Sequence, residues 1–220
     1  MLNALATFTL VFLSSLALAE DSGVVLFEEK FSNKLGEGWV WVREHRQAWR
    51  LIDGGLEIKV EPGNMWGPAN DAKNVLVRPV PKNKDHLEFT VTVRHNPTAQ
   101  YEQVDLVWYY DDSHMVKLGQ EMVDGKLSIV MGREEKDRTR TIAIIPLDSQ
   151  QVELKLEKSG REIRGAFRTS INQPWQEAGR CDLPIPPGGT PKISLQAYQG
   201  PADAEHWARL TDFRIRELKP

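Results

Sequence analysis

The sequence is poor in cysteine, in net charge and in long apolar runs. Cys181 is the only cysteine among 220 residues, so no intramolecular disulfide can form and a hydrophobic core must stabilise the fold. The formal net charge is −3, which excludes the strongly basic surface that attracts nucleic acid or acidic membranes. With 40% hydrophobic and 27% charged residues, the chain has the composition of one globular domain with a large core. We expect neither nucleic acid nor a membrane as a partner of the mature chain.

The one apolar run of note lies at the N-terminus. Residues 1–19 contain no charged side chain, hold an apolar run from Leu10 to Leu18 and end in Ala-Leu-Ala. Small residues at the last and third-last positions are typical of a signal-peptide cleavage site. An uncleaved membrane anchor is the alternative, but the run is shorter than the ~20 residues that span a bilayer. We therefore expect residues 1–19 to be a signal peptide and residues 20–220 to form a single secreted or periplasmic domain.

No stretch of ten or more residues repeats its apolar positions with the period of a helix. Short segments such as 87–94 and 152–157 instead alternate apolar and polar residues, and Gly, Pro, Asn or Asp separate them. Roughly a dozen such segments at spacings of ~8–12 residues predict an all-β fold, with two antiparallel sheets stacked as a β-sandwich. Cys181 falls at the edge of one segment, where we expect a small buried side chain and not a nucleophile.

The stretch Tyr101–Leu118 has two faces of different chemistry. It predicts two strands joined by a turn at Asp111-Asp112-Ser113-His114. Along the first strand, one face carries Val104, Leu106, Trp108 and Tyr110, and the other carries Gln103, Asp105, Val107 and Tyr109. The first face belongs to the core. The second places an amide, a carboxylate and an aromatic ring in a row, so Gln103, Asp105 and Tyr109 are candidate ligand-binding residues.

Other segments supply the remaining candidates, which are Trp41, Arg43, Trp66, Asn74, Arg78, Gln196 and Tyr198. Aromatic rings cover the apolar faces of sugars, amides offer both donors and acceptors, and a guanidinium presents a rigid fork. Alternation is expected to place Trp41 with Arg43 on one strand face, and Asn74 with Arg78 on another. Two alternatives stay open, because Trp41 and Trp66 can also pack in the core and a solvated strand face explains Asn74 and Arg78 equally.

Motifs for catalysis and for metal binding are missing from the chain. Glycoside hydrolysis needs two carboxylates ~5–5.5 Å apart for retention or ~6.5–9.5 Å apart for inversion. Glu102 and Asp105 lie on opposite faces of their strand, and Val107 stands two positions after Asp105. There is no Gly-x-Ser-x-Gly sequence, and the five histidines are scattered. We expect no cofactor. A structural calcium ion is compatible with a secreted sandwich, but nothing in the sequence locates its site.

The segment FEEKFSNKLGEGWVWVRE begins at Phe27, and it is followed by WRL at Trp49, DGGLEI at Asp53, KNVLVR at Lys73 and QVDLVWYYDD at Gln103. Together these segments resemble the concanavalin A-like lectin/glucanase superfamily. Within it, the chain resembles uncharacterised bacterial domains described as regulation-of-enolase-like and the C-terminal sandwich of bacterial beta-xylosidases. The resemblance implies a two-sheet jelly roll whose concave face holds carbohydrate in many members, and it does not imply catalysis. Relatives often have Gln-Ala-Gly-Leu where this chain has Gln-Val-Asp-Leu from Gln103, which makes Asp105 the residue of most interest.

Three hypotheses follow from these observations. The first is a secreted domain that binds a glycan without catalysis, on the sheet face that carries Asp105. The second is a glycoside hydrolase or polysaccharide lyase whose carboxylates come from separate strands, with Asp105 joined by Glu44 or Glu121. The third is an interaction domain of the cell envelope without a small ligand, which a loop such as residues 65–72 folded over the Asp105 face would favour.

Overall fold

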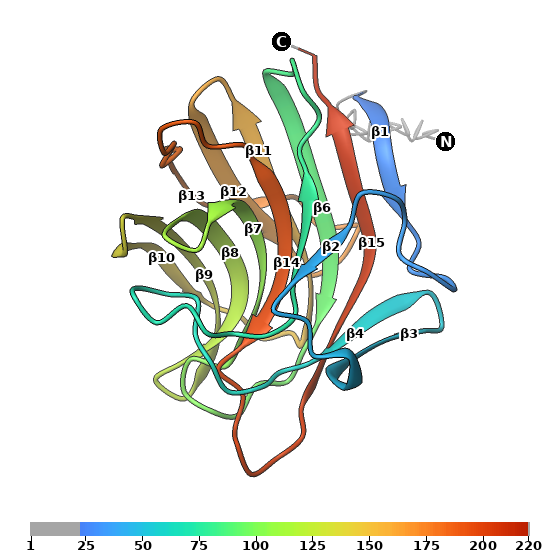
Figure 1. Ribbon diagram of the computed structural model, residues 1–220, viewed down its shortest axis with the longest axis vertical. Helices are drawn as coiled ribbons and strands as arrows, with labels where there is room; N and C mark the ends of the chain where they lie inside the picture. Colours follow the sequence, from blue (N-terminus) through green and yellow to red (C-terminus); the bar gives the residue numbers. More distant parts are fainter. Residues whose placement is uncertain (1–22, 220) are drawn as a thin grey trace, which may run out of the picture.

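Residues 23–219, which the computed structural model describes, form two antiparallel sheets stacked as a sandwich (Figure 1). The eight-stranded sheet has the order β13 (Gln176–Asp182), β12 (Glu162–Arg168), β11 (Gln151–Ser159), β6 (His86–Arg94), β15 (Trp207–Glu217), β4 (Gly55–Lys59) and β3 (Trp49–Ile52), with β1 (Val24–Glu29) also paired to β15. The seven-stranded sheet has the order β10 (Arg138–Pro146), β9 (Lys126–Glu135), β8 (His114–Val123), β7 (Gln103–Asp111), β14 (Lys192–Tyr198), β5 (Val75–Pro79) and β2 (Val40–Val42). The predicted all-β sandwich is confirmed.

Residues 23–219 contain almost no helix. The one helical segment there is the 3-10 turn Arg46–Ala48. No helix of residues 23–219 has the length and apolar character needed to cross a membrane. The expected signal peptide at residues 1–19 lies outside the described residues.

The core lies between the two sheets and follows from alternation along the strands. In β7, Val104, Leu106 and Trp108 are buried and pack with Leu118 of β8 and Phe89 of β6. The rings of Trp108 and Phe89 meet edge to face, with their centroids 5.7 Å apart, an arrangement that contributes ~0.5–1.5 kcal/mol beyond area burial. The predicted core face of β7 is therefore confirmed, and its other face points away from the eight-stranded sheet.

Strands β7 and β8 form the hairpin that the sequence predicts. At its tip, the Asp111 carboxylate accepts a hydrogen bond from the Ser113 amide at 2.9 Å and lies 2.8 Å from Nδ1 of His114. The pairing runs from the tip to the opposite end, where Gln103 pairs with Glu121. The turn thus fixes which β8 side chains lie beside those of β7.

A buried carboxylate anchors the start of β7. Glu102 is fully buried, and its Oε2 accepts hydrogen bonds from the amides of Thr98 and Ala99 at 2.8 and 3.0 Å. Its Oε1 lies 2.7 Å from Nδ1 of His206 and 3.1 Å from Nε2 of His95. Burial acts to raise the pKa of Glu102, but the contacts with His95, with the two amides and with His206 together lower it to about 2. Glu102 therefore joins the loop before β7 to the loop before β15.

Cys181 lies on β13, an outermost strand of the eight-stranded sheet, and it is buried. Its side chain belongs to the main core. Burial raises the pKa of its thiol to about 11, so the thiolate is scarce at neutral pH. The expectation of a small core side chain at Cys181 is confirmed.

Candidate functional site

The outer face of the seven-stranded sheet, which points away from the other sheet, gathers most of the expected site residues. From β14 across β7 to β8, its rows are Tyr198, Gln103 and Glu121; Gln196, Asp105 and Gly119; Ser194, Val107 and Lys117; and Lys192, Tyr109 and Met115. Strand β9 adds Gly132 beside Lys117 and Glu134 beside Met115. Gln103, Asp105 and Tyr109 thus share one face with Gln196 and Tyr198.

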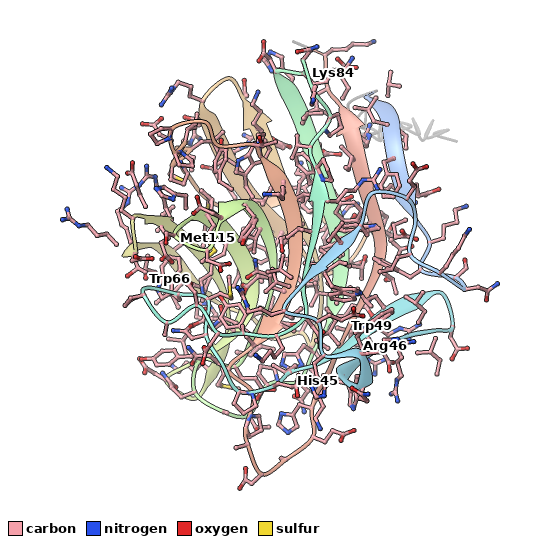
Figure 2. The ribbon with its side chains drawn as sticks, viewed as in Figure 1. His45, Arg46, Trp49, Trp66, Lys84 and Met115 are labelled. Carbon is pink, nitrogen blue, oxygen red and sulfur yellow. The ribbon has the colours of Figure 1, made fainter. Side chains whose placement is uncertain are left out.

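Residues 63–72, which we call the covering loop, lie over this face. Met65 and Ala72 are fully buried there, in a hydrophobic cluster with side chains of β5, β7, β8 and β14. Trp66 packs against the same cluster, and its ring centroid lies 4.8 Å from Nζ of Lys117. Figure 2 shows Trp66 close to Met115 of β8. Asp105 has no exposed surface, so the covering loop closes this face in the structure, as the third hypothesis described.

Arg43 holds the covering loop to the β7–β8 hairpin. Its guanidinium pairs with the Asp112 carboxylate at 2.6 Å, donates to the Ala72 carbonyl at 2.7 Å and contacts the sulfur of Met65 at 3.0 Å. The Tyr109 hydroxyl donates to the same carboxylate at 2.6 Å. Arg43 and Tyr109 are therefore engaged in fixing the loop, and their polar groups do not face the space around Asp105.

Beneath the covering loop lies a buried polar cluster, made up of Gln103, Asp105, Lys117, Glu121, Glu134, Gln196 and Tyr198. Lys117 donates to Gln103 and, at 2.8 Å, to Glu121. Five oxygen atoms of the cluster find no hydrogen-bond partner among residues 23–219: both carboxylate oxygens of Asp105, one each of Glu134 and Gln196, and the Tyr198 hydroxyl. A buried polar atom without a partner costs about 1–3 kcal/mol, so this concentration under one loop calls for donors from outside the chain.

Two carboxylates of the cluster have raised pKa values. Burial raises the pKa of Asp105 to about 7, although the nearby Lys117 charge opposes the rise. The Tyr198 hydroxyl is near enough to lower the pKa of Asp105 slightly, but it does not have the geometry of a hydrogen bond. Burial likewise raises the pKa of Glu134 to about 7, against the Gly67 amide, which donates to its other oxygen at 3.0 Å. Both groups therefore titrate near neutral pH.

Two glycines make room for the site. A Cβ atom at Gly119 would overlap the carboxylate of Asp105, and one at Gly132 would overlap the ring of Trp66. Asp105 thus lies across the backbone of β8, and Trp66 lies across the backbone of β9. The absence of a side chain at Gly119 leaves room for Asp105, and its absence at Gly132 lets the covering loop approach the sheet.

Gly132→Ala is expected to displace Trp66 and loosen the covering loop. Because the neighbouring atoms belong to the indole ring, the ring must shift, and the packing of residues 63–72 on the sheet weakens. Amide hydrogen exchange of residues 63–72, followed by mass spectrometry, should become at least about tenfold faster. Thr141→Ala, which changes the exposed residue paired with Gly132 on β10, is the control, and equal exchange in both variants would contradict the assignment.

Sequence reasoning missed three members of the face. Lys117 and Glu134 were not recognised, and Glu121 appeared only as a partner for Asp105 in the enzyme hypothesis. The turn at 111–114 sets the register that brings Lys117 and Glu121 beside the β7 row, and the Asp124-Gly125 turn does the same for Glu134 on β9. The signal was therefore present in the two turns.

The expectation that Trp41 belongs to this face is wrong. Trp41 packs against the core between the sheets, and its ring centroid lies 4.8 Å from that of Trp49. Val42, the next residue, packs against the cluster under the covering loop. The alternation fails because Arg43 has a positive φ of 53°, which turns its side chain to the face opposite that of Trp41.

Asn74 and Arg78 also lie away from the site. The Arg78 guanidinium lies 3.4 Å above the centroid of the Phe27 ring and donates to the Glu37 carbonyl at the end of the sandwich. Asn74 is buried with φ of 53°, accepts from the His45 amide at 2.7 Å and donates back to its carbonyl at 3.2 Å. Both residues brace the chain around β2 and β5, and neither belongs to the cluster around Asp105.

Of the two carboxylates that the enzyme hypothesis pairs with Asp105, only one lies on the same face of the sheet. Glu121 shares the face of Asp105, but Lys117 already pairs with it. Glu44 lies at the surface and accepts a hydrogen bond from the Trp49 indole at 3.0 Å. Among residues 23–219, no three His, Cys, Asp or Glu side chains are grouped as metal ligands.

Comparison with known proteins then gives the chain a context. The model of a family described as the beta xylosidase C-terminal concanavalin A-like domain matches residues 28–184. A search of curated proteins found no match. Among solved structures, the GH43 protein BlXynB from Bacillus licheniformis superposes with a TM-score of 0.76 at 19% identity, over 86% of this chain and 39% of that one.

Two further structures extend the comparison. The xylan beta-1,4-xylosidase from Bacillus halodurans C-125 gives a TM-score of 0.74 at 17% identity, over 86% of this chain and 39% of that one. A functionally unknown protein from Saccharomyces cerevisiae gives 0.65 at 13% identity, over 83% of this chain and 98% of that one. The chain thus spans about two fifths of the two bacterial proteins, and at these identities the likeness concerns the fold. It confirms the jelly roll that the sequence resemblance implied.

Proposed function

Because the chain belongs to the family of the beta xylosidase C-terminal concanavalin A-like domain, we propose that it is a glycan-binding domain without catalytic activity. Its site is the buried polar cluster on the outer face of the seven-stranded sheet. We also propose that the domain acts outside the cytoplasm, in the periplasm or the medium, to which a signal peptide at residues 1–19 would direct it.

The observation that carries this proposal is the group of five unpartnered oxygen atoms on Asp105, Glu134, Gln196 and Tyr198. Most of them only accept hydrogen bonds, and a sugar presents several hydroxyl donors at spacings of a few ångströms. Trp66 adds an aromatic ring that can cover the apolar face of a sugar. A ligand of this chemistry would satisfy the atoms that the protein leaves without partners.

Binding at this site requires the covering loop to move. The contacts that hold the loop include the buried side chain of Met65, the ring of Trp66 over Gly132, the hydrogen bond from the Gly67 amide to Glu134 and the hydrogen bond from Arg43 to the Ala72 carbonyl. These contacts are few compared with those of the sheet beneath, so the loop can open without unfolding the sandwich. Glycan binding would then be slower than diffusion, because the competent state is a minor one.

Affinity electrophoresis and calorimetry on residues 20–220 with a panel of neutral polysaccharides test the proposal at pH 8. Asp105→Asn removes a charged acceptor and should weaken binding about 10- to 100-fold. Tyr198→Phe removes one hydroxyl and should weaken it about two- to tenfold. Asp203→Asn, at an exposed position, is the matched control. Retention by no polysaccharide, or unchanged binding in both site variants, would contradict the proposal.

The second candidate is an interaction domain of the cell envelope without a small ligand. It is favoured by the complete burial of Met65 and Ala72 on the Asp105 face, which closes that face in this structure. Under this alternative, the panel gives no binding and Gly132→Ala does not create any. Turnover of a polysaccharide, lost in Asp105→Asn, would instead favour a hydrolase or lyase.

A further inference from the structure

The outer face of the eight-stranded sheet carries a depression that no loop covers completely. Two cavities of about 1050 and 550 Å³ lie on it. They share four lining residues, namely Glu153, Arg168, Ile171 and Arg214, and therefore form one continuous trough. Strands β6, β11 and β15 make its floor, and residues 169–175 overhang one side.

At the larger end of the trough the charges are balanced. Arg216 pairs with Glu88 at 2.9 Å, and Lys155 pairs with Glu157 at 2.5 Å. The ring of Trp175 is held there, with its centroid 4.4 Å from Nζ of Lys155. This end presents an aromatic ring among charged side chains that neutralise one another in pairs. Such a surface suits an uncharged part of a ligand.

The smaller end contains a guanidinium that forms no ion pair with a carboxylate of the described residues. Arg94 of β6 lies directly opposite Arg209 of β15, and like charges in this cross-strand position destabilise a sheet. Arg209 is compensated by Glu57 at 3.2 Å and by the Asp53 carbonyl at 2.7 Å. The exposed Arg94 side chain makes no hydrogen bond and no ion pair with any residue from 23 to 219.

Neither of the two carboxylates that line this end forms an ion pair with Arg94. Glu153 pairs with Arg168 at 2.5 Å, and Asp212 accepts a hydrogen bond from the Thr211 hydroxyl at 2.8 Å. Of the four arginines that line the smaller cavity, Arg94 alone has no carboxylate partner among residues 23–219, since Arg168, Arg209 and Arg214 are each paired. An anion placed at Arg94 would relieve the repulsion between the two opposed arginines.

Neutral hydrogen-bonding groups surround Arg94. Thr92 lies on the same strand and faces the trough, Gln151 pairs with Arg94 across β11, and Thr169 and Ser170 come from the overhanging loop. Hydroxyl and amide groups recognise sugar hydroxyls, whereas a guanidinium recognises a carboxylate through two parallel hydrogen bonds. The combination favours an acidic sugar over a bare inorganic anion, which would leave these neutral groups unused.

We propose that the trough is a second binding site, which takes a uronic-acid glycan. One sugar carboxylate binds Arg94 beside Thr92, and the chain of sugars runs along the floor toward Trp175. This site lies on the opposite side of the sandwich from Asp105 and does not depend on the glycan-binding function proposed for that face.

The test uses residues 20–220 and oligomers of galacturonic, glucuronic and mannuronic acid, each compared with its fully methyl-esterified form. Calorimetry should give binding of at least one acid oligomer, at least about tenfold weaker binding of its uncharged ester and a loss of affinity with added salt. Arg94→Gln should weaken binding of the acid oligomer at least about tenfold. Arg138→Gln, an exposed position on β10 of the other sheet, should leave it unchanged.

The inference would be overturned by no binding of any acid oligomer, by equal binding of acid and ester, or by full binding in Arg94→Gln. If sodium sulfate competes as strongly as the sugar acid does, the trough is a general anion site, and the inference is also overturned. Asp105→Asn should bind the acid oligomers as the wild type does, so a failure at the covered face and a failure at the trough can be told apart.

Discussion

Asp105→Asn is expected to raise the free energy of unfolding at pH 8 by up to about 4 kcal/mol. Burial raises the pKa of Asp105 from 3.8 to about 7, and each unit of pKa difference corresponds to about 1.36 kcal/mol. Between these two values the folded state keeps a proton that the unfolded state has lost. Stability therefore falls as pH rises through this range, and it is fully present only below the unfolded pKa. Asparagine cannot ionise, so the variant avoids this loss.

Chemical denaturation at pH 5 and at pH 8 measures the effect. The gain should be about 4 kcal/mol at pH 8 and less than half of that at pH 5, and the melting temperature at pH 8 should rise by roughly 8–15 °C. Lys117 keeps its partner Glu121 in the variant, so no new unpaired charge is created. Asp203→Asn should change neither value. A variant less stable than the wild type at pH 8 would show that an unrecognised donor satisfies the Asp105 carboxylate.

Glu102→Gln is expected to lower the free energy of unfolding by about 3 kcal/mol at pH 7. The pKa of Glu102 is lowered from 4.5 to about 2, a difference of more than two units at about 1.36 kcal/mol each. The stabilisation is present above pH 4.5 and is lost as pH falls toward 2. A glutamine keeps the shape of the side chain but cannot serve the amides of Thr98 and Ala99 and both imidazoles as a charged acceptor.

The measurement is urea denaturation from pH 7 down to pH 3. The gap between wild type and Glu102→Gln should narrow as the pH approaches 3, because the Glu102 carboxyl of the unfolded wild-type chain takes up a proton below about pH 4.5 while that of the folded protein stays ionised. Glu162→Gln, at an exposed position of β12, is the control. A constant gap at every pH would mean that packing, and not the charge of Glu102, stabilises the two loops.

Much of the fold could be predicted from the sequence because its signals are local. Alternation along β7 assigned Val104, Leu106 and Trp108 to the core, and the Asp111 turn predicted the hairpin; both are confirmed. The same alternation failed at Arg43, where a positive φ reverses the side chain. The residue type of an arginine does not indicate a positive φ. Trp41, which was placed on the same face as Arg43, was therefore assigned to the wrong face.

The covering loop could not be predicted in the same way. Its position depends on the buried Met65 and on the absence of a side chain at Gly132, positions that are far apart in the chain. The turn residues in this segment indicate a loop but do not say which surface it lies on. A loop over this face favours the hypothesis of an interaction domain without a small ligand. Whether the loop opens decides between that hypothesis and glycan binding.

The single cysteine allows the opening of the strand that carries it to be measured by thiol labelling. With the pKa of the Cys181 thiol at about 11 in the folded protein, only about one molecule in a thousand carries a thiolate at pH 8, compared with roughly one in four when the chain is unfolded and the pKa is ~8.5. A thiol reagent such as an aromatic disulfide will therefore report mainly on molecules in which β13 has opened. Its reaction rate gives the opening equilibrium of β13, at the edge of the eight-stranded sheet, in native buffer without denaturant.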